Sequence, residues 1–102
     1  MTLDDARERI RKGEYLVSQH AFIESAKDKV EDADIRSAIF DGEVLETYPL
    51  DKRGMSILVG GKTLDGRPLH VVVGLAYDEP VIITAYVPTP PKWISPGERG
   101  GS

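Results

Sequence analysis

The spacing of hydrophobic residues along the chain changes close to Gly42. Before this point they recur at every third or fourth position, which is the spacing of one face of an α-helix. The pattern predicts helices over residues 3–12, over 19–29, and from 32 or 34 to 41. The first half of the chain is therefore expected to be helical.

From residue 43 the hydrophobic period shortens toward two, which is the spacing of one face of a strand. Four strands are predicted, over residues 43–48, 55–63, 67–74 and 81–86. A short apolar segment, Tyr15–Val17, is a candidate for an additional edge strand. We therefore predict an α+β fold in which N-terminal helices pack on a four-stranded antiparallel sheet.

Residues 1–93 are expected to form one α+β domain, because 102 residues suffice for a single modest core. The proline-rich segment that begins at Pro88 can be neither a helix nor a central strand. The end of the chain is rich in glycine and polar residues, so residues 94–102 are predicted to be a disordered tail.

Two residues have the side chains that commonly begin a helix. Thr2 and Ser18 each stand where an N-cap is needed, ahead of the first and the second predicted helix. In the second helix Phe22, Ala26 and Val30 fall on one side at a spacing of four. We interpret that side as the apolar face of this helix.

The dipeptide Asp65-Gly66 predicts a tight hairpin turn, because both residues tolerate a positive φ. A two-residue turn here pairs Leu64 with Arg67, and hence places Gly61 opposite His70. A glycine opposite the histidine leaves space above the imidazole ring.

The next connection, residues 76–80, has the polar and proline content of a loop. If Leu75 pairs with Val81 across it, His70 falls opposite Tyr86. The same register places Val72 opposite Thr84 and Gly74 opposite Ile82. Directly opposed residues share a sheet face with Cβ atoms about 4.5–5.5 Å apart, so an imidazole and a phenol are predicted to be neighbours.

The composition excludes several classes of function. The chain has no cysteine, which rules out disulfides, thiol nucleophiles and cysteine zinc sites. It has no apolar run near the roughly 18 residues of a membrane span, and its charged start has no signal-peptide core. We expect a cytoplasmic protein without a membrane partner.

The charge balance argues against nucleic-acid binding, because the formal net charge is −4. The acidic residues lie mainly in the helical half. From Lys52 onward six basic residues stand against four acidic ones, so the sheet half is slightly basic. DNA is not an expected partner, and RNA binding is expected to be weak and salt-sensitive.

Several phrases of the sequence resemble one family, known as domain of unknown function 4258. They are Ser18-Gln-His-Ala, Arg53-Gly, Thr63-Leu-Asp-Gly-Arg-Pro-Leu-His-Val-Val-Val, Ile83-Thr-Ala-Tyr-Val-Pro and Lys92-Trp. The resemblance spans Tyr15 to Trp93, and the family is grouped with the RelE/ParE-like toxins. It implies helices packed on an antiparallel sheet, and a messenger-RNA-cleaving toxin with a small antitoxin protein as its partner.

The chain departs from the family at two positions. The family pattern carries arginines four and eight residues after the histidine of Ser-Gln-His-Ala. Here these positions hold Glu24 and Asp28. Two cations that suit phosphate binding are thus replaced by anions, which argues against RNA binding by this helix.

Metal-independent RNA cleavage needs a base for the 2′-hydroxyl, an acid for the 5′-oxygen and cations for the phosphate. The candidate catalytic residues are His70, Tyr86 and His20. His70 is alternatively a structural histidine, and Tyr86 a packing residue. His20 lies one helical turn from Glu24, so the two form a charge pair or, with His70, a metal site. We expect neither a metal nor a cofactor.

The candidate phosphate-binding residues are Arg53, Lys92 and Arg67. A guanidinium binds two phosphate oxygens at once. Arg53 is alternatively a solvated charge in a turn, and Arg67 a residue that only flanks the hairpin turn. Trp93 suits either base stacking or anchoring of the tail. Two hypotheses follow: a small metal-independent endoribonuclease toxin, or a non-catalytic protein-interaction module of the same fold.

Overall fold

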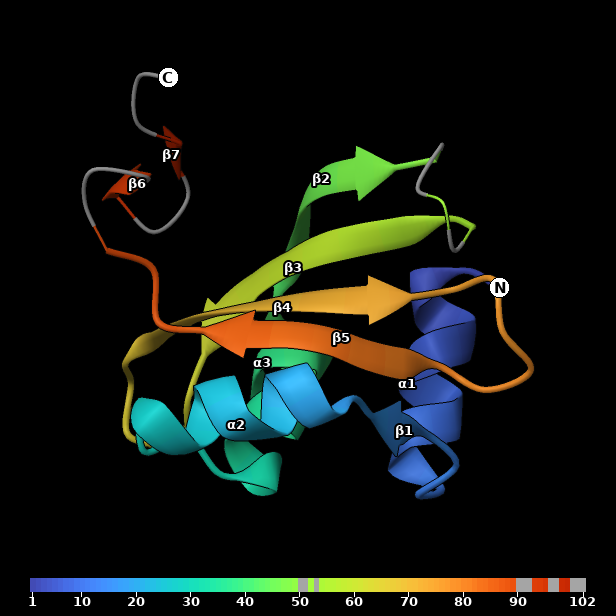
Figure 1. Ribbon diagram of the computed structural model, residues 1–102, viewed down its shortest axis with the longest axis horizontal. Helices are drawn as coiled ribbons and strands as arrows, with labels where there is room; N and C mark the ends of the chain where they lie inside the picture. Colours follow the sequence, from blue (N-terminus) through green and yellow to red (C-terminus); the bar gives the residue numbers. More distant parts are fainter. Residues whose placement is uncertain (50–51, 53, 90–92, 96–97, 100–102) are drawn as a thin grey trace.

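The computed structural model describes residues 1–49, 52, 54–89, 93–95 and 98–99, and the side chains up to residue 89. Three helices come first in the chain and most of the strands follow them (Figure 1). The elements are α1 (Leu3–Arg11), β1 (Leu16–Val17), α2 (Gln19–Lys27), α3 (Asp32–Asp41), β2 (Glu43–Tyr48), β3 (Ser56–Lys62), β4 (Pro68–Gly74), β5 (Val81–Tyr86), β6 (Trp93–Ser95) and β7 (Glu98–Arg99). The predicted change from helix to strand near Gly42 is confirmed.

The prediction of a four-stranded antiparallel sheet is wrong. In the described part of the chain, five strands form a mixed sheet in the order β1-β5-β4-β3-β2. Strand β1 runs parallel to β5, with Leu16 opposite Val81, and the other pairs are antiparallel. The backbone N–H of Leu16 donates to the Pro80 carbonyl at 3.0 Å. A two-residue strand has no alternation of its own, so its direction is set by this tertiary contact.

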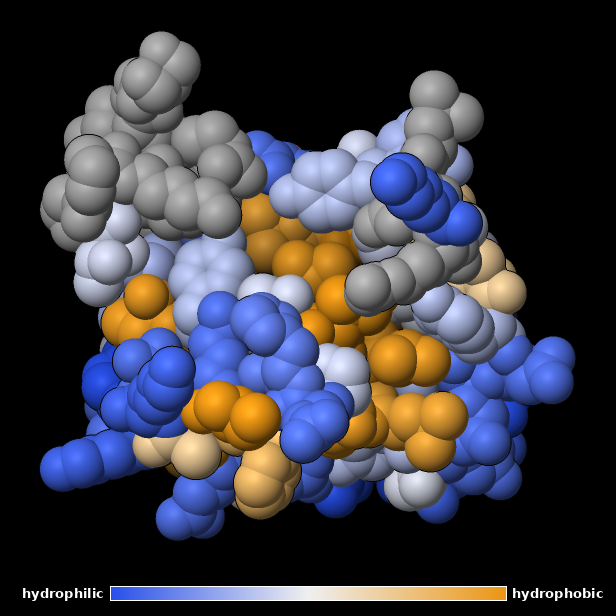
Figure 2. All heavy atoms as spheres, in the orientation of Figure 1, coloured by the Kyte–Doolittle hydropathy of each residue, from blue (hydrophilic) through white to orange (hydrophobic). Residues whose placement is uncertain are grey.

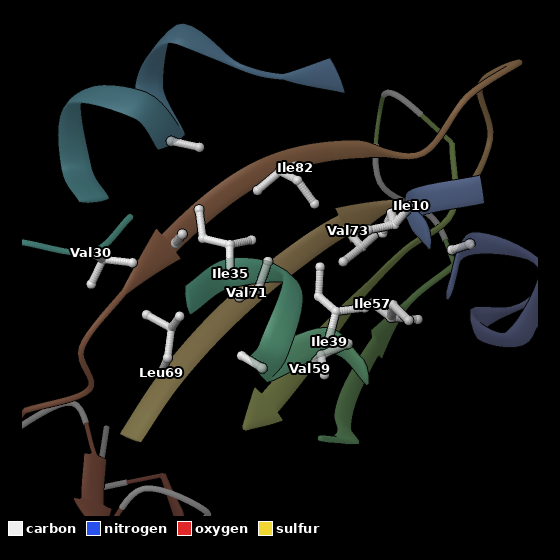
Figure 3. Close-up of a cluster of buried hydrophobic side chains, with 14 of the residues drawn as sticks. Ile10, Val30, Ile35, Ile39, Ile57, Val59, Leu69, Val71, Val73 and Ile82 are labelled. Carbon is white, nitrogen blue, oxygen red and sulfur yellow. The ribbon is translucent and has the colours of Figure 1, made fainter. Parts of the chain in front are cut away.

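The hydrophobic core lies between the helices and one face of the sheet. Figure 3 shows Ile35 and Ile39 of α3 beside Val71 and Val59 of the central strands, and all four are at most 2% exposed. Each fully buried aliphatic side chain contributes about 1.5–3 kcal/mol. Helix α3 approaches β3 so closely that a Cβ at Gly61 would lie 2.3 Å from the Ala38 carbonyl oxygen.

The predicted pairing of His70 with Tyr86 is confirmed, as is that of Val72 with Thr84. The pairing of Gly74 is wrong by one residue, because a register shift after Val72 places Gly74 opposite Val81. His70 and Tyr86 lie on the sheet face opposite the core, since their neighbours along the two strands belong to the core.

The predicted hairpin turn at Asp65-Gly66 is one residue too short. The Thr63 N–H donates to the Arg67 carbonyl at 2.8 Å, so three residues form the loop, and Gly66 has φ +88°. The glycine opposite His70 is consequently Gly60 rather than Gly61.

The space expected above the histidine is also filled. A Cβ at Gly60 would lie 2.5 Å from Cδ1 of Leu45, so this leucine of β2 occupies the position over the glycine. The glycine therefore makes room for a neighbouring side chain.

The predicted apolar face of α2 is wrong at two of its three positions. Phe22 is 69% exposed and Ala26 is exposed, whereas Val30 joins the core. The buried positions of α2 are Ala21 and Ser25. Small residues are needed there because α2 lies close against β5 (Figure 1).

The predicted tail, residues 94–102, is described only in part. Strands β6 and β7 pair with each other as a separate two-stranded sheet. The remaining residues of this tail lie outside the described part of the chain. Within the described residues, no helix is both long and apolar enough to cross a membrane.

Candidate functional site

A pocket of about 810 Å³ lies between α2 and the end of β5. Three of the residues predicted from the sequence line it, namely His20, Arg67 and Tyr86. Other residues also line it, among them Glu24, Lys27, Asp28 and Thr84. The structure thus brings together side chains that are up to 69 residues apart in the sequence, from His20 to Thr89.

Helix α2 is positioned over the free edge of β5 by its polar side chains. The carboxylate of Glu24 accepts the Ala85 N–H at 2.9 Å, and the carboxylate of Asp28 accepts the Val87 N–H at 3.0 Å. These backbone groups lie beyond the two residues that β1 pairs with. These two acidic residues therefore complete the hydrogen bonding along the edge of the sheet.

The start of α2 is fixed to the same strand. The Ser18 hydroxyl donates to the Ile83 carbonyl at 2.9 Å and accepts the Ala21 N–H at 3.0 Å, as the predicted N-cap should. The bonds that the carboxylates of Glu24 and Asp28 accept involve a charged group, so each contributes about 1.5–3 kcal/mol. The pocket wall formed by α2 is therefore held at both ends of the helix.

His20 stands at the rim of the pocket. Its side chain is 69% exposed, and its Nε2 lies 3.8 Å from a carboxylate oxygen of Glu24. The predicted pair one helical turn apart is thus formed. The other carboxylate oxygen of Glu24 accepts the Ala85 N–H, so this residue links the imidazole to the edge of the sheet.

Tyr86 lines the pocket, and His70 lies behind it on β4, outside the pocket lining. The Nδ1 of His70 lies 3.4 Å from the Tyr86 hydroxyl oxygen, and the rings meet edge to face with centroids 5.4 Å apart. His70 is only 1% exposed, and Tyr86 lines the pocket. A substrate in the pocket would touch the phenol, while the imidazole acts on that phenol from the neighbouring strand.

Arg67 lines the pocket but is engaged with the protein. Its guanidinium donates to the backbone carbonyls of Asp28 at 2.7 Å and Lys29 at 3.0 Å, just past the C-terminus of α2. It also pairs with Asp65. The Thr63 hydroxyl, and after it the Arg67 guanidinium, hold the pKa of Asp65 below its usual value. Arg67 therefore ties the β3–β4 turn to α2.

The other predicted cations, Arg53 and Lys92, lie outside the described residues. The alternative metal site is not formed in the described part of the chain, where no three histidine, aspartate or glutamate side chains are placed to hold an ion.

Sequence reasoning missed Lys27, although it lies seven residues after His20 and so on the same side of α2. It also missed Thr84, which precedes Tyr86 by two residues on the same strand face.

The model of one protein family, Domain of unknown function (DUF4258), matches residues 17–87. The chain belongs to this family. The matched region runs from β1 through β5, so it contains the Tyr86–His70 pair and both ends of α2. No curated protein and no solved structure matches the chain.

Proposed function

We propose that this member of the DUF4258 family is a metal-independent endoribonuclease, the toxin of a toxin–antitoxin pair in the RelE/ParE-like superfamily. The observation that carries the proposal is the convergence of His20 and Tyr86 on one pocket, with His70 in contact with the phenol. RNA cleavage by this route needs two groups that exchange protons and a site that accepts a phosphate. In this pocket His20 and Tyr86 would exchange the protons, and Lys27 would contact the phosphate.

The proposed reaction breaks the bond between phosphorus and the 5′-oxygen. His20 takes the proton of the 2′-hydroxyl, whose oxygen attacks phosphorus. The Tyr86 hydroxyl gives its proton to the departing 5′-oxygen, which leaves a cyclic phosphate and a 5′-hydroxyl end. Imidazole suits the first step because it exchanges protons near neutral pH. His70 acts through Tyr86, so we assign it as a positioning residue.

The charges around the pocket favour a weakly bound substrate. Lys27 is exposed on the pocket wall and is the natural contact for a phosphate. Glu24 and Asp28 share that wall, and their negative charges oppose the phosphodiester. With a net charge of −4, the chain should bind RNA only at low salt. Besides RNA, the proposed partner is a small antitoxin protein, which would block the pocket.

The test is single-turnover cleavage of a defined RNA by the full chain, with and without ribosomes. His20→Ala and Tyr86→Phe should each slow cleavage about 10²–10⁴-fold, the usual contribution of one acid or base. Tyr77→Phe is the matched control, because Tyr77 contacts the far end of β4 at Gly74 and should leave the rate unchanged.

The melting temperature of every variant separates chemistry from folding. His20 is exposed, so His20→Ala should melt like the wild type. Equal rates for wild type and His20→Ala would refute the catalytic role. A wild-type protein that cuts nothing under either condition would instead support the non-catalytic interaction module.

A further inference from the structure

A second surface of α2 is apolar. Leu16 and Val17 of β1 are 56% and 38% exposed, and Phe22 and Ile23 of α2 are 69% and 48% exposed. Hydrophobic residues interrupt the hydrophilic surface over this helix (Figure 2). Isolated exposed apolar residues are ordinary, but a contiguous group of them on a small domain indicates a binding surface.

This surface contains a groove of about 340 Å³. Its apolar walls are formed by side chains of β1, of α2, of the α2–α3 connection and of α3, namely Val17, Phe22, Ala26, Val30 and Ile35. Phe22 and Ala26 stand one helical turn apart, with Cβ atoms about 5–6 Å from each other. A second helix presents apolar side chains at the same repeat, so it matches the groove better than an extended strand does.

The charges of the groove identify the chemistry of its partner. The only charged residues among its described lining are Glu31 and Asp32, and both are exposed acids. Asp32 accepts the Tyr15 hydroxyl at 2.6–2.7 Å, which fixes the carboxylate beside the groove. Arg36 lies one turn further along α3 and is outside the groove lining. A basic flank on the partner would complement these charges, while an acidic one would be repelled.

We propose that this groove, the Phe22 groove, binds an amphipathic helix of another protein whose apolar face is flanked by Lys or Arg. A second copy of this chain is the poorer match, because it would bring the same acidic rim and a net charge of −4. The proposal concerns the side of α2 that faces away from the His20 pocket. It therefore stands independently of ribonuclease activity.

The experiment is a selection from displayed helical peptides of about 15 residues, or four turns. One face varies among apolar residues, and the flanking positions vary among Lys, Arg, Glu and Gln. The full chain should enrich peptides with Lys or Arg flanks. Titration of an enriched peptide should shift the amide resonances of Phe22, Ala26 and Val30, and its affinity should fall as salt is raised.

Two variants test the groove directly. Phe22→Ser removes the exposed anchor and should weaken the peptide at least about tenfold. Ala26→Lys keeps a helix-favouring residue, adds a cation and should do the same. Leu64→Ser is the matched control, because Leu64 is 71% exposed on the β3–β4 turn and should have no effect. Each variant should keep the wild-type melting temperature.

Four outcomes would overturn the proposal. They are enrichment of acidic or uncharged flanks, equal peptide affinity in wild type and Phe22→Ser, failure to enrich any peptide over the Phe22→Ser protein, and self-association of the chain that Phe22→Ser abolishes. The last result, measured by sedimentation, would assign the groove to a second copy.

Discussion

The two sides of helix α2 differ in what their side chains do. On one side Glu24 and Asp28 accept backbone N–H groups of β5 and of the residue after it, and the pocket there is lined mainly by polar and charged residues. On the other side Phe22 and Ile23 are exposed, and most residues that line the groove there are apolar. The polar side is anchored by directional bonds, whereas the apolar side can gain free energy only by being covered.

A nine-residue helix can contribute to two different surfaces because of how it is attached to the sheet. The narrow buried base of α2 consists of Ala21 and Ser25, which provide little hydrophobic stabilisation. Carboxylate-to-backbone bonds supply what the small side chains do not. The helix is consequently attached without a wide apolar face, and its apolar residues remain exposed for another use.

The largest expected effect comes from separating the two surfaces by mutation. His20→Ala should lower single-turnover RNA cleavage about 10²–10⁴-fold and leave peptide binding unchanged. Phe22→Ser should have the opposite profile, with peptide binding weakened and cleavage retained. Measuring both activities for both variants completes the comparison. If each variant lost both activities to the same degree, the two surfaces would be one site.

The next effect concerns the base of α2. Ala21→Leu forces a larger side chain into a fully buried position and should cost about 1–3 kcal/mol of unfolding free energy. Ala26→Leu makes the same chemical change at an exposed position of the same helix and should change stability by less than about 0.5 kcal/mol. Urea unfolding of the two variants measures the difference. Equal losses would mean that α2 is not seated on Ala21.

Much of this organisation was predictable from the sequence, because local signals specify it. The helices, the N-cap at Ser18 and the facing of His70 and Tyr86 all depend on short-range periodicity and on a loop of known length. The predicted strand pairing is wrong by one residue at Gly74 and at Gly60. The bulge and the three-residue turn that cause these shifts have no clear signal in the sequence. Boundaries of this kind are set by tertiary packing.

The sequence predicts some residues of the candidate site but not the long-range contacts that position them. The chemistry of their side chains makes His20 and Tyr86 candidates in the sequence, and the fold brings them to one pocket. The faces of α2 were assigned wrongly because Phe22 looks like a core residue by its hydrophobicity alone. Nothing local shows that Glu24 and Asp28 bond to a strand about 60 residues later. The parallel pairing of β1 with β5 was not predicted either, because it also depends on a contact between distant parts of the chain.

A smaller effect tests the anchoring of the polar side. Glu24→Gln keeps an acceptor for the Ala85 N–H but removes the charge, so it should cost about 1 kcal/mol, the difference between charged and neutral hydrogen bonds. Glu8→Gln is the matched control, because the side chain of Glu8 makes only exposed ion pairs, with Arg11 and Lys12, among the described residues. It should cost less than about 0.5 kcal/mol. A Glu24 variant as stable as the control would show that this bond does not hold α2.

The smallest effect lies on the apolar side and depends on pH. Partial burial, and after it the hydrogen bond to Asp32, raise the pKa of Tyr15 to about 12. The unfolded chain loses this proton near pH 10, so the folded state holds more protons between pH 10 and 12. The Tyr15 contribution to stability is therefore complete below pH 10 and declines as pH rises toward 12. Because the phenol is partly exposed to solvent, we expect this contribution to the free energy of unfolding to be less than about 1 kcal/mol.

Tyr15→Phe should remove this part of the alkaline decline, and denaturant unfolding of both proteins from pH 8 to 11.5 measures it. A decline that is identical with and without the hydroxyl would mean that Tyr15 does not hold the Asp32 carboxylate beside the Phe22 groove.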